Sequence, residues 1–450
     1  MLDIRLIREN PQIVLADLKA RKDTEKQGWI KEITEMDKEY RALLQEAEEL
    51  RRKRNVNTDK ITKIISTQET QTIKDPRVPG GSFQKSKPSQ EQIEIRLNLG
   101  AENKNLNEKI GEIEPKSVKL KEKIDGYLMR LPNILHKSVP IGKDDSENIV
   151  VKETGGKISN KEMPPHGEVL EKNGWADFAR ATKVAGSGFY FLKGDFALLE
   201  MALLRFSVDK LVDKGFAAIS PPLMMNRHAY EGVTDLSDFE SVMYKVDADD
   251  LYLIATSEHP MAAMYKDEIF SEEELPLKFA GVSPCFRREI GKHGIDTRGI
   301  FRVHQFNKVE QFVFAKPEDS WKIHEELLAN AEEIFFDLGI AYRVVNVCSG
   351  DIGTVAAKKY DIEAWMPREE KYREVVSNSN CTSYQAVRSN IKLKRKDGTK
   401  EYLHTLNSTA VATARALRAI VETHYKGDAL KIPKPLQKYM GGAKEITAQK

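Results

Sequence analysis

An arginine and a glutamate two positions apart, Arg287 and Glu289, begin the segment that is best suited to chemistry. A polar, glycine-bearing stretch over 291–298 follows them, and then an apolar stretch over 301–310. This order predicts a β-hairpin, in which residues two apart share a face, so Arg287 and Glu289 are expected to project together. Such a pair suits a ligand that offers a phosphate to the arginine and an amine to the carboxylate. An isolated pair of this kind is more often a surface cross-pair, so the context must decide.

Three other segments offer complementary groups. Glu374 and Ser377 have a spacing at which a carboxylate and a hydroxyl could hold Mg²⁺ against triphosphate oxygens. A run of small residues over 407–415 ends in Arg415, so a backbone can approach a ligand while a guanidinium covers a flat face. The residues 256–258, Thr-Ser-Glu, follow a short apolar strand pattern and offer a hydroxyl and a carboxylate at its end.

Several common chemistries lack their motifs. The chain has no P-loop, no His-Glu-x-x-His and no Gly-x-Ser-x-Gly, and residues 186–188 lack the third glycine of a dinucleotide-binding loop. The three cysteines show no Cys-x-x-Cys spacing, which excludes a disulfide framework and gives no support for a zinc site.

The composition limits the class of protein. A chain of 450 residues has room for two to four domains, and 71 basic against 69 acidic residues leave a net charge of +2, so nucleic-acid contact must come from local basic patches. We find neither an apolar stretch of about 20 residues nor a signal-peptide pattern. We therefore expect a protein without membrane segments and with a cytoplasmic location.

The N-terminal region, 1–135, has the periodicity of a helical hairpin. Apolar residues at alternating spacings of three and four form a heptad seam. On the first helix these are Ile33, Met36, Tyr40, Leu43, Ala47, Leu50, Ile61 and Ile64, and on the second Leu99, Leu106, Ile110, Ile113, Leu120, Ile124 and Tyr127. The polar residues Arg54 and Asn57 interrupt the seam, Pro115 is expected to kink or interrupt the second helix, and the stretch 75–88 joins the two.

This hairpin carries basic residues toward its far end: Arg51, Arg52, Lys53, Arg54, Lys60, Lys63, Lys85, Lys87 and Arg96. They fit two interpretations, a solvated coiled-coil face or a basic rod that lies along a phosphate backbone with salt-sensitive binding. The charges alone do not choose between them.

The remaining region, 136–450, alternates short apolar strand patterns with amphipathic helices. This order predicts an α+β domain, a mainly antiparallel sheet flanked by helices.

Together these segments resemble the class II aminoacyl-tRNA synthetases and, more narrowly, the seryl-tRNA synthetases. Residues 215–222 resemble motif 1, 286–310 motif 2 and 406–415 motif 3, while 256–258 resemble the serine enzymes' Thr-x-Glu element. The resemblance implies a class II catalytic domain over 136–450, a tRNA-binding arm over 1–135 and a homodimer formed through motif 1.

The resemblance also implies roles for individual residues. Arg287, Glu374 and Arg415 would be catalytic. ATP and Mg²⁺ would be held by Arg287, Glu289, Phe306, Glu374, Ser377 and Arg415, with Phe306 and Arg415 on either side of the adenine and the metal on Glu374 and Ser377. L-serine would be bound by Thr256, Glu258, Arg287, Glu310 and Thr409. Lys292 and Arg298 would be candidates for contact with the tRNA acceptor end.

The implied reaction joins serine and ATP into seryl-adenylate and then transfers serine to tRNA(Ser), which the arm would bind. The serine carboxylate attacks the α-phosphorus, so the protein needs no nucleophile of its own. Three alternatives stay open at this point: an arm-bearing paralogue without charging activity, an amino acid ligase that charges a carrier protein, and a coiled-coil scaffold whose C-terminal half only dimerises.

Overall fold

The computed structural model describes residues 1–66, 69–74, 82–236, 240–289 and 299–448. Lys292 and Arg298 lie outside these residues, as do residues 75–81 of the stretch 75–88 that joins the two long helices. The chain divides into two compact units, one made of residues 24–128 and the other of 1–23 together with 129–450. The sequence-based domain bounds, 1–135 and 136–450, stay a prediction.

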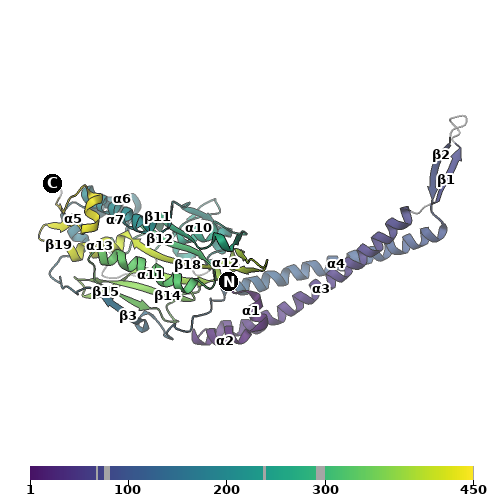
Figure 1. Ribbon diagram of the computed structural model, residues 1–450, viewed down its shortest axis with the longest axis horizontal. Coiled ribbons are helices and arrows are strands. Elements are labelled where there is room, and N and C mark those ends of the chain that lie inside the picture. The colour runs from purple at the N-terminus through teal and green to yellow at the C-terminus, as the bar shows by residue number, and fades with distance from the viewer. Residues whose placement is uncertain (67–68, 75–81, 237–239, 290–298, 449–450) are drawn as a thin grey trace. The chain divides into compact units, whose positions relative to one another are not determined.

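The smaller unit is built on two long helices. Its elements are α3 (Thr24–Ser66), β1 (Glu69–Lys74), β2 (Ser82–Lys87) and α4 (Gln90–Arg130), of which α4 ends in the larger unit (Figure 1). The strands β1 and β2 pair antiparallel; the sequence analysis did not predict them.

The helices α3 and α4 pack antiparallel along the expected seam. Arg51 Nη2 bonds Glu114 Oε1 at 2.6 Å and Arg54 Nη1 donates to Asn107 Oδ1 at 3.2 Å, so residue numbers rise on one helix as they fall on the other. The buried seam residues include Ile33, Ala47, Asn57, Leu106, Ile110, Ile113 and Ile124. The helix α4 runs through Pro115 without a break, so this proline does not interrupt it, while the expected kink stays a prediction.

An eight-stranded sheet forms the centre of the larger unit, in the order β3-β13-β14-β15-β18-β12-β11-β6. All neighbours pair antiparallel except β11 and β6. The strands are β3 (Ile149–Thr154), β6 (Ala217–Ile219), β11 (Leu277–Phe286), β12 (Gln305–Ala315), β13 (Tyr342–Asn346), β14 (Lys358–Met366), β15 (Lys371–Thr382) and β18 (His404–Ala412). The predicted fold class, α+β with an antiparallel sheet between helices and a helical hairpin, is confirmed.

Helices cover both faces of this sheet (Figure 1). The described helices of the larger unit are α1 (Ile4–Glu9), α2 (Pro11–Ala20), α5 (His166–Lys172), α6 (Phe178–Ala185), α7 (Gly194–Asp213), α8 (Arg227–Glu231), α10 (Glu258–Ala263), α11 (Ser320–Asp337), α12 (Tyr384–Arg388), α13 (Thr413–His424) and α14 (Lys434–Gln437). Smaller ribbons and sheets are formed by β4 (Ala176–Asp177), β5 (Phe191–Leu192), β7 (Met224–Asn226), β8 (Lys245–Val246), β9 (Leu251–Leu253), β10 (Ile269–Ser271), β16 (Lys392–Lys394), β17 (Lys400–Tyr402), β19 (Tyr425–Lys426), β20 (Ala429–Lys431) and β21 (Glu445–Thr447).

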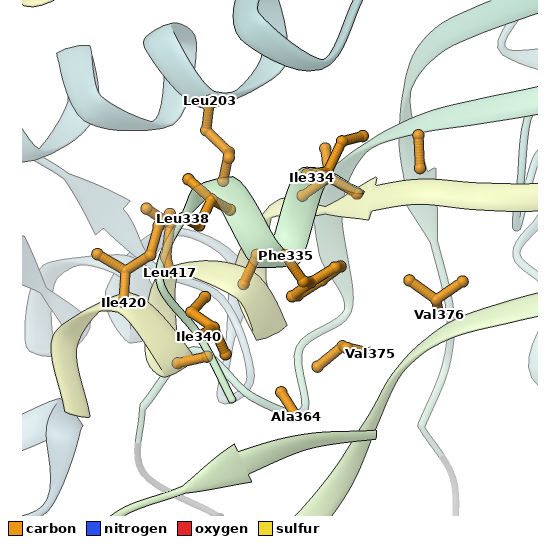
Figure 2. Close-up of a cluster of buried hydrophobic side chains, with 14 of the residues drawn as sticks. Leu203, Ile334, Phe335, Leu338, Ile340, Ala364, Val375, Val376, Leu417 and Ile420 are labelled. Atoms are coloured by element: carbon orange, nitrogen blue, oxygen red, sulfur yellow. The ribbon is translucent and has the colours of Figure 1, made fainter. Parts of the chain in front are cut away.

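The larger hydrophobic core lies on the face that α7, α11 and α13 cover. On α11, apolar residues recur every three or four positions, which gives the helix one buried stripe. Figure 2 shows this stripe against side chains of the sheet and of the neighbouring helices: Leu203, Ile334, Phe335, Leu338, Ile340, Ala364, Val375, Val376, Leu417 and Ile420. This packing fixes one face of the sheet, so the strands can present polar side chains on the other.

A second cluster lies on the opposite face, where the short helix α10 packs on β12, α12 packs on β18 and α8 packs on α10. It includes Tyr230, Met261 and Ala386 from these helices, and Phe312 and Phe314 from the strand. Among the described residues, no helix is both long enough and apolar enough to cross a membrane.

Candidate active site

A cavity of about 330 Å³ opens on the face of the sheet that carries α10 and α12. All ten residues predicted to be catalytic or to bind serine, ATP or Mg²⁺ line it: Thr256, Glu258, Arg287, Glu289, Phe306, Glu310, Glu374, Ser377, Thr409 and Arg415. They come from four separate segments of the chain, so the fold brings together what the sequence keeps apart.

Alternation along β12 supplies one wall of this cavity. Phe306, Lys308 and Glu310 line the cavity, whereas Val309 and Val313 between and beyond them belong to the core under α11. The neighbouring strand β18 contributes Asn407 and Thr409 to the same wall, and Glu310 is the register partner of Thr409.

Buried ion pairing dominates one end of the cavity, which we call the serine end (Thr256, Glu258, Lys308, Glu310, Asn407 and Thr409). Lys308 Nζ forms a short ion pair with Glu310 and donates to Thr256 Oγ1 at 3.1 Å. The side chains of Lys308 and Glu310 are only 8% and 1% exposed. Burial raises the pKa of Glu310, although the ammonium of Lys308 acts in the opposite direction.

The Glu258 carboxylate sits at the start of α10 and is held by two amides. Gln385 Nε2 and Asn407 Nδ2 donate to its Oε1 at 2.9 and 3.1 Å. Burial, and next the nearby Glu310, raise the pKa of Glu258 to about 7, against the attraction of Lys308. Because Lys308 neutralises Glu310, an ionised Glu258 leaves the serine end with one net negative charge, which suits a ligand ammonium.

Thr256 has a defined hydrogen-bond polarity. Its hydroxyl oxygen accepts from Lys308 Nζ at 3.1 Å and from the backbone N–H of Glu258 at 3.3 Å. With both lone pairs engaged, its own hydrogen is left to donate to an acceptor.

Arg287 anchors the middle of the cavity. Its Nε donates to the carbonyl of Ala255 at 3.3 Å, and its guanidinium lies 5.4 Å from the centre of the Phe306 ring. The strand β11 ends at Phe286, and Glu289 has a φ of 41°. Arg287 and Glu289 therefore both line the cavity, but not as the strand neighbours that the sequence analysis expected.

The opposite end of the cavity, which we call the nucleotide end (Glu289, Phe301, Glu374, Ser377 and Arg415), is more open. Arg415 Nη1 donates to the backbone carbonyl of Glu374 at 3.0 Å and lies 3.3 Å from its carboxylate Oε1. Burial acts to raise the pKa of Glu374, but Arg415, with Lys359 and Arg287, outweighs it and the pKa is lowered. The Glu374 side chain is nevertheless 47% exposed, so this carboxylate is ionised and accessible.

The aromatic partner of Arg415 differs from that of Arg287. The Arg415 guanidinium lies 5.5 Å from the ring of Phe301, which the sequence analysis did not select. The cavity therefore offers two arginine–aromatic pairs, with Phe306 beside Arg287 and Phe301 beside Arg415.

The sequence analysis missed several polar residues of the cavity, above all Lys308, Lys359 and Asn407. A signal for Lys308 was available, because it lies two residues before Glu310 on a predicted strand and must share its face. Asp361 is buried 3.6 Å from Lys359 Nζ, and burial is the main cause that raises its pKa to about 7.

Comparison with known proteins identifies the fold and both regions of the chain. Residues 243–424 match the class II tRNA synthetase core domain (G, H, P, S and T), and residues 1–78 match the seryl-tRNA synthetase N-terminal domain.

Relatives match over nearly the whole chain. The serine–tRNA ligase of Methanocorpusculum labreanum is 56% identical over 98% of this chain and 99% of its own, and that of Pyrococcus horikoshii is 48% identical over 100% and 98%. The crystal structure of the Pyrococcus horikoshii seryl-tRNA synthetase complexed with ATP superposes with a TM-score of 0.86, at 47% identity and with full coverage of both chains. The chain therefore belongs to the seryl-tRNA synthetase family and is a serine–tRNA ligase.

Proposed function

We propose that the cavity is the place where serine is activated, with the amino acid at the serine end and ATP at the nucleotide end. The observation that supports this most is that ten residues predicted from four separate segments line one cavity. Arg287, between the two ends, would contact both the serine carboxylate and the α-phosphate.

At the serine end, the charge balance supports binding of an amino acid ammonium by Glu258. The hydroxyl of the substrate would bond to Glu310 and Thr409, while Thr256 donates its free hydrogen. Because these groups are buried, alanine would leave them without partners, and a loss of this kind gives about 10⁴-fold rejection without editing. Threonine would be excluded by the space that its methyl group needs.

At the nucleotide end, Glu289 would accept from the adenine amino group, and Phe306 and Arg415 would cover the two faces of the ring. The serine carboxylate would attack the α-phosphorus directly and displace pyrophosphate as the bond to the bridging α,β-oxygen breaks, with Arg287 and Arg415 stabilising the charge that develops there. Catalysis would thus come from positioning and electrostatic stabilisation rather than from a protein nucleophile.

The donor set at this end fits Mg²⁺. Glu374 and Ser377 offer a carboxylate and a hydroxyl to the cavity, and the described part of the chain has no group of three or more His, Cys, Asp or Glu residues that could hold a metal. Mg²⁺ takes few protein oxygens and keeps its remaining positions for water and phosphate. When bound, the ion would neutralise charge on the triphosphate.

The helical arm would bind tRNA(Ser). Arg52 and Lys53 are exposed on α3, which supports contact with a phosphate backbone. Replacing Arg52 and Lys53 together by Glu should raise the KM for tRNA(Ser) in aminoacylation and leave serine-dependent pyrophosphate exchange unchanged.

A homodimer would form through α7 and β6. The strand β6 is an edge of the central sheet, and Leu198 and Met201 on α7 are 51% and 63% exposed, which supports a covered apolar face there. Sedimentation analysis of the wild type and of Met201→Glu tests this proposal. The cytoplasmic location expected from the sequence stays a prediction.

Serine-dependent exchange of pyrophosphate into ATP tests the cavity assignment. We expect exchange in the wild type and its loss in Arg287→Ala. The matched control is Arg288→Ala, because Arg288 is the next residue and its exposed side chain is not part of the cavity lining. Equal exchange in the two variants, or equal exchange with alanine in place of serine, would contradict the proposal.

A further inference from the structure

A buried glutamine outside the cavity holds the carboxylate that we assign to the serine ammonium. Gln385, on α12, is 1% exposed and does not line the cavity. Its Nε2 donates to Glu258 Oε1 at 2.9 Å and to the backbone carbonyl of Val233 at 3.3 Å, while its Oε1 accepts from Thr405 Oγ1 at 2.6 Å.

These partners define the orientation of the amide. The carbonyl of Val233 can only accept, so the nitrogen of the Gln385 amide must face it. The amide oxygen then points at Thr405, whose hydroxyl is fully buried and donates to it. Because every polar atom of the amide is engaged, Gln385 has one orientation and presents an N–H to Glu258.

Gln385 and Asn407 converge on the same oxygen of Glu258. Both amides donate to Oε1, and neither bonds Oε2. Two N–H donors on one carboxylate oxygen fix the rotation of the carboxylate and stabilise its ionised form. The other oxygen is thereby set in a constant direction relative to the cavity that Glu258 lines.

The same helix region also holds the neighbouring cavity wall. Successive carbonyls over 231–234 accept from Arg388, Ser389, Gln385 and again Arg388, at 2.8, 2.7, 3.3 and 2.5 Å. Val233 and Thr234 line the cavity. Gln385 therefore bonds both to this wall and to Glu258, and it links the position of one to that of the other. The helix α12, which carries Gln385, lies beside β18, which carries Asn407 (Figure 1).

We infer that Gln385 is a positioning residue for serine: it acts through Glu258, which it holds in the orientation that binds the substrate ammonium. The inference rests on the proposed role of Glu258. It requires that loss of the Gln385 amide weaken serine binding selectively, because no ATP-binding group that we propose contacts Gln385.

The test measures the KM for serine, the KM for ATP and kcat in pyrophosphate exchange with the full-length enzyme. Gln385→Met keeps the length of the side chain and removes its donors. We expect the KM for serine to rise about tenfold to a hundredfold, the effect of losing one hydrogen bond to a charged group, with the KM for ATP and kcat little changed.

The matched control is Gln311→Met. Gln311 is also buried and also bonds through both ends of its amide, to the carbonyl of Leu327 at 3.1 Å and to Asn330 Nδ2 at 2.9 Å. It follows Glu310 on β12 but faces α11, so its replacement should cost stability without changing the KM for serine.

Two further variants keep the inference falsifiable. Thr405→Val removes the hydroxyl that orients Gln385 and should raise the KM for serine in the same direction but less, even if Gln385→Met does not fold. In a Glu258→Gln background, Gln385→Met should have no additional effect on the KM for serine, because the residue through which it acts is already altered.

The outcomes separate the two proposals. If Glu258→Gln leaves the KM for serine unchanged, the proposed role of Glu258 fails. If Glu258→Gln raises that KM while both Gln385→Met and Thr405→Val behave like Gln311→Met, only the positioning role of Gln385 is overturned.

Discussion

The two ends of the cavity are built in opposite ways. At the serine end, Lys308, Glu310 and Asn407 are buried and bonded to one another or to their neighbours. At the nucleotide end, Glu374 and Arg415 form a partly exposed pair. The first end has its polar groups arranged before a ligand arrives, whereas the second leaves charged groups accessible.

This difference matches the sizes of the two substrates. Serine offers few atoms for recognition, so discrimination must come from desolvated groups whose loss of partners is costly. ATP offers a large ring and several charged phosphates, so exposed arginines and a metal can bind it without deep burial. Because the charges of the serine end are buried, removing one of them leaves its partner uncompensated and lowers the free energy of unfolding.

Removing the buried cation of the serine end should give the largest effect on the free energy of unfolding. Lys308→Met removes the only cation that directly pairs with Glu310 among the described residues. Glu258 and Glu310 thereby lose the positive charge that acts most strongly against their raised pKa values. Breaking a buried ion pair in this way costs about 3 to 5 kcal/mol. We expect that decrease in the free energy of unfolding, measured by urea denaturation at pH 8.

Lys278→Met is the matched control. Lys278 also pairs with a glutamate, Glu326, at 2.6 Å, but both partners are partly exposed, so its replacement should cost less than about 1 kcal/mol. Equal losses in the two variants would show that the serine end is not a buried charge network in solution.

A change at the nucleotide end should act on metal dependence rather than on folding. We expect Glu374→Gln to raise the Mg²⁺ concentration for half-maximal pyrophosphate exchange about tenfold or more, with the free energy of unfolding unchanged. The control is Glu363→Gln, because Glu363 is the register partner of Glu374 but pairs with Arg343 and does not line the cavity. An unchanged Mg²⁺ requirement in Glu374→Gln would remove this residue from the metal site.

The two ends should also differ in their pH dependence. With the pKa of Glu258 near 7, the carboxylate that binds the ammonium is largely protonated at pH 6 and ionised at pH 8. The kcat/KM for serine should therefore rise about tenfold over this interval. Glu374, whose pKa is lowered, stays ionised throughout, so the KM for ATP at saturating serine and Mg²⁺ should change much less.

Stability gives an independent check on the sign of this effect. Because the pKa of Glu258 is raised in the folded protein, its protonated form favours folding, and that contribution is lost as the pH rises through about 7. Serine binds the ionised form of Glu258, which prevails at pH 8. Serine should therefore raise the melting temperature more at pH 8 than at pH 6, and Glu258→Gln should abolish this difference. A serine-induced shift that does not depend on pH would contradict the role of Glu258.

Site residues within motifs and buried positions within a heptad repeat could be predicted from the sequence. All ten residues that the motif segments predicted for binding serine, ATP or Mg²⁺ line the cavity, and the heptad period predicted even the polar seam residue Asn57, which is buried on α3. Both signals are local, because a motif or a period is visible within one short segment.

The remaining contacts depend on segments that are distant in sequence and on elements too short to show a period. Gln385 is 127 residues from Glu258, and α12, which carries it, has five residues. The bond from Lys308 to Thr256 likewise joins a strand to the loop that precedes α10. The carboxylates of the serine end, Glu258 and Glu310, were thus predictable from the sequence, but their hydrogen bonds and ion pairs became known only from the structure.

The smallest predicted effect concerns the pair at the nucleotide end. Arg415 and Glu374 are 3.3 Å apart with side chains 28% and 47% exposed, so solvent screens their attraction. A double-mutant cycle with Arg415→Met and Glu374→Gln should give a coupling in unfolding free energy of less than about 1 kcal/mol, although each single variant impairs exchange. A coupling as large as that of a buried pair would mean that this end is also closed in solution, and the contrast with the serine end would disappear.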